Sequence, residues 1–162
     1  MFSFSACIFA VAGIGCFIGF VEMYSSSRRQ RKLARAAGAL GAIACLGLIG
    51  VAATPGDRYP LLHGQFSLLA SGAFLGGNLI FAIATTLDAR FPRIVPLGWS
   101  LVTAVLLGWI WVSHRVSSTD LGQCIAIAYQ KIVAVVVVMN FFFQIYQADR
   151  VARRGNGWSC PR

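Results

Sequence analysis

Five long runs of apolar residues dominate the chain, and short polar segments separate them. Each run is close to the roughly 17–25 residues that an α-helix needs to cross the hydrocarbon core of a bilayer. The runs are continuously apolar, whereas a membrane-spanning strand alternates apolar and polar positions. Proline and glycine follow several runs, where helices tend to break. The pattern predicts an all-α bundle of five membrane-spanning helices, at about 7–24, 36–54, 64–87, 95–113 and 121–146, with a short tail at 147–162.

The composition agrees with an integral membrane protein. Hydrophobic residues make up 57% of the 162 residues and charged residues 12%, and the mean hydropathy is +0.71. A soluble domain usually contains about 25% charged residues. The length suits one domain. We therefore expect a single multi-pass domain in the plasma membrane, the inner membrane of a bacterium.

The distribution of positive charge predicts the orientation. Eleven of the fourteen Lys and Arg residues lie in the first and third connections or after the last run. The other connections contain only Arg58 and Arg115, and Lys131 lies within the fifth run. Cytoplasmic segments are the ones enriched in Lys and Arg. The N-terminus is therefore expected outside and the C-terminus in the cytoplasm, as five crossings require. A cleaved signal peptide would need positive charge before the first run, and "MFSFSA" has none.

The densest group of cations lies in the loop expected between the first two helices. Each cation at this interface would attract anionic lipid headgroups by about 1 kcal/mol. The simpler interpretation is that the group only determines orientation. Aromatic residues are not interleaved with it and no nucleic-acid-binding fold is recognisable, so no nucleic-acid partner is expected. The group consists of Arg28, Arg29, Arg31, Lys32 and Arg35.

Two pairs of glycines have the spacing at which helices approach closely in lipid. "GCFIG" contains Gly15 and Gly19, and "GAFLG" contains Gly72 and Gly76. Packing inside the bundle is the favoured interpretation, and the face of a homo-oligomer is the alternative.

The fifth run carries polar residues, which are costly to bury in lipid without partners. Lys131 lies about 14 Å below the outer end of this run, where it needs a carboxylate, carbonyl groups or water. Asn78, halfway along the third run, is the expected partner for hydrogen bonds between helices. Five further residues share an arc of about 120° and should face protein or water: Gln123, Gln130, Asn140, Gln144 and Gln147.

The two outer connections bring more polar side chains to the same side of the membrane. The first, "TPGDRYPLLHGQF", spans 54–66, and the second contains "SHRVSSTD". Two histidines with a carboxylate could hold a metal ion or transfer a proton. However, no HxxxH spacing and no GxSxG motif occur, so we expect no metal and no other cofactor. The candidate outer cluster consists of Asp57, His63, His114, Asp120, Gln130 and Lys131.

The first outer connection and the last run carry a family resemblance. The chain resembles an uncharacterised bacterial six-helix membrane family, a domain of unknown function. That family is distantly similar to the group of the FGF-receptor-activating protein and the damage-regulated autophagy modulators. The resemblance rests on "GVAATPGDRYPLLHG" and "YQKI" and spans about 31–149. It implies a helical bundle with matching polar positions at Asp57, His63, Gln130 and Lys131, and no reaction, cofactor or substrate. The chain departs from the family in showing five runs.

These patterns support three hypotheses of function. The leading one is a non-enzymatic bundle that interacts with membrane lipids, anionic ones on the cytoplasmic side, with a membrane-protein partner or with a second copy. The alternative is a membrane enzyme that acts on a lipid or headgroup at the outer face through Asp57, His63, His114 and Lys131. A small transporter comes third, because neither a repeat nor a pair of broken helices is evident.

Overall fold

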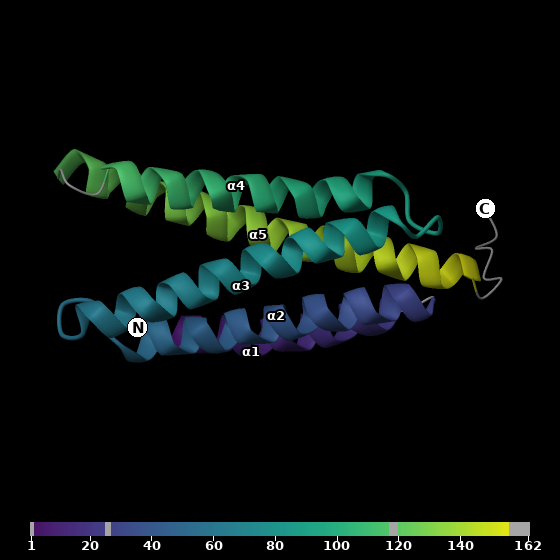
Figure 1. The fold of residues 1–162 in the computed structure, drawn as a ribbon, viewed down its shortest axis with the longest axis horizontal. Helices are drawn as coiled ribbons and strands as arrows, with labels where there is room; N and C mark the ends of the chain where they lie inside the picture. The colour runs from purple at the N-terminus through teal and green to yellow at the C-terminus, as the bar shows by residue number, and fades with distance from the viewer. Residues whose placement is uncertain (1, 25–26, 117–119, 156–162) are drawn as a thin grey trace. The chain divides into compact units, whose positions relative to one another are not determined.

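A computed structural model describes residues 2–24, 27–116 and 120–155 of the chain. Within these residues it contains helices and no strands, which confirms the all-α prediction (Figure 1). The helices are α1 (Phe2–Met23), α2 (Arg28–Ala53), α3 (Pro60–Thr86), α4 (Ile94–Val116) and α5 (Asp120–Gly155).

Four of the described helices are long and apolar enough to cross a membrane. They are α2, α3, the segment Ile94–Ser113 of α4 and the segment Ile127–Arg153 of α5. Ala10–Met23 of α1 is a shorter apolar helix. The chain is therefore a multi-pass helical membrane protein.

The helices form two compact units, Met1–Ala84 and Thr85–Arg162. The first unit contains α1, α2 and nearly all of α3, and the second contains α4 and α5. In the first unit α1 and α2 run antiparallel, because Gly13 lies opposite Cys45 while Val21 lies opposite Gly38.

The core of the first unit is a cluster of aromatic rings from α1, from Tyr24 directly after it and from α3. The Phe17 ring lies 6.0 Å from that of Phe74 and 6.1 Å from that of Phe81. The Phe81 ring also lies 5.9 Å from Phe20 and 5.5 Å from Tyr24. Ring pairs at these separations stabilise a fold beyond their buried area. The cluster therefore holds α1 against α3.

Glycines of α2 allow its close contacts with both neighbouring helices. A Cβ atom added to Gly41 would meet the Phe17 ring of α1 at a separation under 3.0 Å. A Cβ atom added to Gly47 would lie 2.9 Å from the backbone nitrogen of Ala70 in α3. Since neither position has room for a side chain, these glycines set the distances between the helices.

The two glycine pairs predicted from the four-residue spacing are not the glycines that make the closest contacts between helices. A Cβ atom added to Gly15, Gly19 or Gly72 meets nothing within 4 Å, and one added to Gly76 meets only Leu40, at 3.2 Å. The prediction of close packing was therefore wrong for the first three, because their side of the helix does not face another helix of the first unit.

The start of α2 differs from the sequence prediction. The helix begins at Arg28 and not at residue 36, so the expected basic loop is helical. Ser27 caps the helix, because its side chain accepts a hydrogen bond of 3.2 Å from the backbone N–H of Gln30. Arg, Lys, Gln, Leu and Ala are good helix formers. The hydropathy pattern marked the apolar part of the helix and missed its polar beginning.

The end of α5 also differs from the sequence prediction, because the hydropathy pattern misses the polar last turns of this helix. The helix continues to Gly155, so residues 147–155 of the expected tail are helical, while 156–162 lie outside the described residues. Arg153 and Asp149 form an ion pair of 2.8 Å at i,i+4 spacing, which supports a helix in water.

Candidate functional site

The first outer connection is closed by hydrogen bonds to the end of α2. The Nδ1–H of His63 donates to the carbonyl oxygen of Thr54 at 2.6 Å. The hydroxyl of Thr54 donates to the carbonyl of Gly50 at 2.7 Å. The last carbonyls of a helix have no partner within the helix. His63 therefore has a structural role in this turn, in which Asp57 is exposed to the surroundings.

The remaining members of the predicted outer cluster belong to the second unit. Gln130 and Lys131 are exposed on α5, and the side chains of His114 and Asp120 lie outside the described residues. Within residues 2–24, 27–116 and 120–155, no three His, Cys, Asp or Glu side chains lie together as metal ligands. The six-residue cluster stays a prediction.

The polar face of α5 packs against α4 over part of its length. Gln144 is fully buried, and its Nε2 donates to the carbonyl of Val95 at 3.0 Å and to Oδ1 of Asn140 at 3.1 Å. Gly98 leaves the space for these amides, because an added Cβ atom would lie 2.6 Å from Asn140 Oδ1 and 2.8 Å from Gln144 Nε2.

The polar face of the fifth run is expected to meet protein or water. Asn140 and Gln144 lie against α4, and Gln147 is also buried. Gln130 is exposed, and the side chain of Gln123 lies outside the described residues. For Asn78, the expected hydrogen bond to another helix stays a prediction. Asn78 is fully buried in α3, where its Nδ2 donates to the carbonyl of Phe74 at 2.6 Å, while its Oδ1 has no partner among the described residues.

Two of the predicted cytoplasmic cations have carboxylate partners. Asp88, buried in the connection between α3 and α4, accepts from Arg90 Nη2 at 2.7 Å and from Arg90 Nε at 3.0 Å. These hydrogen bonds raise the pKa of Arg90 above its usual value. Arg153 pairs with Asp149 in α5. Both pairs reduce the positive charge that these positions offer to another molecule.

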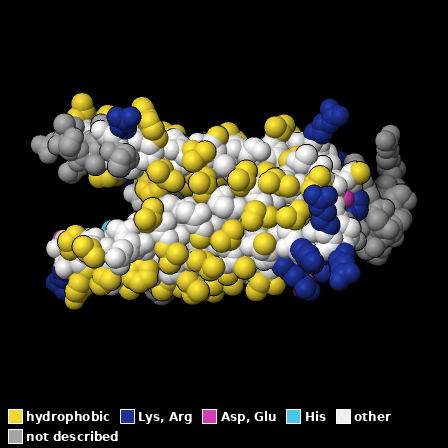
Figure 2. Space-filling model, in the orientation of Figure 1, with side chains coloured by type: hydrophobic (Ala, Val, Ile, Leu, Met, Phe, Trp, Pro, Cys, Tyr) yellow, Lys and Arg dark blue, Asp and Glu magenta, His cyan; other side chains and the backbone are white. Residues whose placement is uncertain are grey.

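The cations at the start of α2 are different. In the described part of the chain, none of the five forms an ion pair, and all five are exposed. Figure 2 shows Lys and Arg side chains gathered over the beginning of this helix. The largest concentration of uncompensated charge at the predicted cytoplasmic side therefore lies on the first two turns of α2.

The helical arrangement gives these cations a direction that a loop would not have. At about 100° per residue, three of them lie within about 60° of the direction of Arg35, whereas Arg29 lies about 120° away. We name the aligned set the cationic stripe. It consists of Arg28, Arg31, Lys32 and Arg35.

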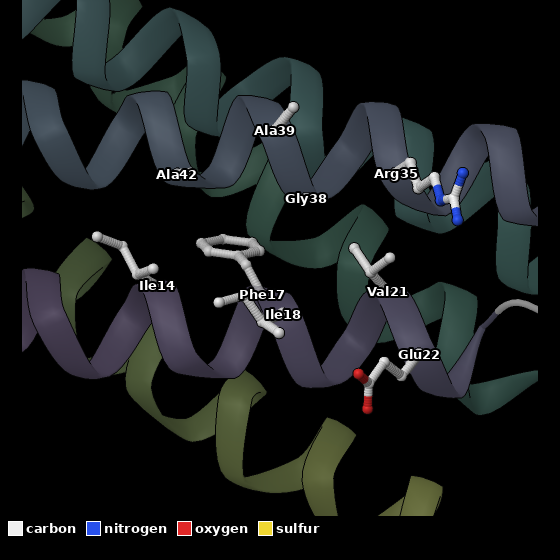
Figure 3. A pocket seen from close by; sticks show the side chains of 9 residues that line it. All are labelled: Ile14, Phe17, Ile18, Val21, Glu22, Arg35, Gly38, Ala39 and Ala42. Carbon is white, nitrogen blue, oxygen red and sulfur yellow. The ribbon is translucent and has the colours of Figure 1, made fainter.

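An open groove of about 420 Å³ begins where the cationic stripe ends (Figure 3). It is hollow because α2 presents only small residues to it beyond Arg35. At its charged end the side chains of Glu22 and Arg35 point away from each other (Figure 3). Its lining comes from Ile14, Phe17, Ile18, Val21 and Glu22 of α1 and from Arg35, Gly38, Ala39 and Ala42 of α2.

The groove could not be found from hydropathy, because an apolar run looks the same whether its surface is flat or hollow. The available signal was the spacing of Gly38, Ala39 and Ala42 after Arg35, which puts small residues on one face of a helix.

Comparisons with known proteins add no relative. No protein-family model, curated protein or solved structure matches the chain. The family resemblance of the outer connection stays a prediction.

Proposed function

We propose that the protein is a non-enzymatic multi-pass protein of the plasma membrane that binds anionic phospholipids of the cytoplasmic leaflet through the start of α2. The observation that carries this proposal is the group of five exposed cations on the first two turns of a membrane-spanning helix, which have no ion-pair partner among the described residues.

The position of these cations is unfavourable without an anion. The N-terminus of a helix carries partial positive charge, so each cation in the first turn costs about 0.3–1 kcal/mol. The first turn of α2 contains no acidic residue that would offset this cost. A lipid phosphate at this end would interact favourably with the cations and with the positive end of the helix dipole. Helices usually place acidic residues, not cations, in the first turn. The first turn of α2 departs from this preference at the place where an anionic ligand would offset the cost.

Removing two cations of the stripe should weaken binding of anionic lipid. In Arg31→Gln/Lys32→Gln we expect the affinity for phosphatidylglycerol to fall about thirtyfold, because each cation contributes about 1 kcal/mol. The affinity for phosphatidylcholine should not change. The measurement is a titration of the full chain in an uncharged detergent with each lipid, with bound lipid counted by native mass spectrometry.

The matched control is Arg150→Gln/Arg153→Gln, which removes two charges from α5 at the same predicted side. Its effect should be several times smaller, since Arg153 is already paired with Asp149. A reporter after Arg162 checks that each variant keeps the orientation of the wild type. An equal loss in both double variants, or no loss in either, would contradict lipid binding by α2.

A further inference from the structure

We infer that the groove between α1 and α2 is a site for one phospholipid, with an acyl chain along the groove and the phosphate at Arg35. This inference rests on the proposed function and makes it specific. The proposed function requires only that five cations attract lipid. The groove would in addition bind one lipid molecule, with its phosphate at one end and its acyl chain toward the other.

The length of the groove matches one leaflet. From Ile14 to Glu22 the lining of α1 covers eight helical steps, or about 12 Å. Half of the hydrocarbon core of a bilayer is about 15 Å. The groove therefore extends from the cytoplasmic interface, where its charges lie, across most of the inner leaflet. An acyl chain of this leaflet could therefore lie along the groove over much of its length, against an apolar lining.

The shape of the groove is fixed by packing beneath it. A Cβ atom on Gly38 would collide with the side chain of Val21, so the two helices touch at the floor of the groove. Phe17 is buried in the aromatic cluster and cannot turn outward to fill the space. Ala39 is exposed and Ala42 half-buried on the α2 side, and their methyl groups leave the groove open to lipid.

The charges favour a phosphate at one end. Arg35 belongs both to the lining and to the cationic stripe, so three further cations follow it toward the interface. The single carboxylate of the lining, Glu22, points away from Arg35 (Figure 3). The guanidinium of Arg35 can donate two parallel hydrogen bonds to a phosphate. Charge and apolar lining together select an anionic phospholipid over a soluble anion, which would gain nothing from the apolar part.

The test fills the groove without changing charge. In Ala39→Phe the ring would occupy the space of the acyl chain, and we expect the affinity for one phosphatidylglycerol to fall about fifteenfold, the equivalent of two buried methylene groups. Ala36→Phe is the matched control, because Ala36 is also exposed on α2 but does not line the groove. It should stay within about twofold of wild type. Ala42→Leu repeats the test from the same wall.

The charged end is tested in the same assay. Arg35→Gln should weaken binding of the first phosphatidylglycerol about fivefold, and Arg29→Gln, which removes a charge pointing elsewhere, should weaken it less. Free inorganic phosphate should not compete, whereas a soluble-anion site would be emptied by it. Thermal unfolding without lipid confirms that each variant is folded.

The outcomes separate the site from the wider proposal. If Ala39→Phe and Ala36→Phe bind alike while Arg31→Gln/Lys32→Gln still loses phosphatidylglycerol, the groove site is overturned and lipid binding by α2 stands. If wild type does not prefer phosphatidylglycerol to phosphatidylcholine, both fail. If Ala39→Phe changes the oligomeric state and not lipid binding, the groove holds a second copy and the inference is overturned.

Discussion

Replacing Gly41 by valine is expected to lower the free energy of unfolding by about 2–4 kcal/mol, because overpacking a core usually costs about 1–3 kcal/mol and this clash cannot relax locally. Even one Cβ atom at this position would lie under 3.0 Å from the Phe17 ring. That ring is 2% exposed and is held between Phe74 and Phe81. The gain from removing glycine from a helix is less than about 1 kcal/mol, so the clash dominates.

Thermal and denaturant unfolding in detergent, followed by circular dichroism, measures this effect. Gly72→Val is the control within the same unit, since a Cβ atom there meets nothing within 4 Å. Equal stability of the two variants would show that α1 and α2 are not in the close contact described.

Replacing Gly98 by valine should destabilise the second unit by a similar amount. The new side chain would displace the amides of Asn140 and Gln144, so the bond of 3.0 Å from Gln144 to Val95 would be lost at a buried position. A buried polar group left without a partner costs about 1–3 kcal/mol, and overpacking adds a further cost of about 1–3 kcal/mol. We expect about 2–6 kcal/mol in total, measured by unfolding in detergent.

The control for Gly98 is Ala104→Val, an exposed position on the same helix. A double-mutant cycle with Gln144→Ala separates the clash from a general effect, because residues in contact couple by about 0.5–3 kcal/mol. A coupling near zero would mean that Gly98 does not face the amides of α5.

The apolar runs predicted the helices because a membrane-spanning helix must satisfy its backbone internally and present apolar side chains to lipid. The same reasoning failed at the polar ends. The start of α2 at Arg28 and the end of α5 at Gly155 depend on capping, helix propensity and local ion pairs, which the mean hydropathy of a window does not contain.

The packing glycines show a second limit of the sequence. With seventeen glycines in the chain, matches to a four-residue spacing are common by chance. Gly41 contacts α1 and Gly47 contacts α3. These two glycines are six positions apart, so they do not match the four-residue spacing. A glycine is needed at the positions where α2 comes closest to α1 or to α3. Those positions depend on how the three helices pack, which the spacing of glycines does not contain.

The site was predictable only in part. The five cations were evident from the sequence, but the stripe and its continuity with the groove follow from their being helical. His63 was a candidate for chemistry because of its residue type. Its hydrogen bond to the backbone of Thr54, nine residues earlier, depends on the path of the turn, which spacing alone does not define.

Binding of anionic lipid by α2 is tested most directly by native mass spectrometry of the full chain extracted together with its own membrane lipids. We expect that wild type retains one anionic phospholipid, enriched over its share of the membrane, and that Arg31→Gln/Lys32→Gln loses it while Arg150→Gln/Arg153→Gln keeps it. Retention of neutral and anionic lipids in the proportions of the membrane, unchanged in both variants, would contradict the account.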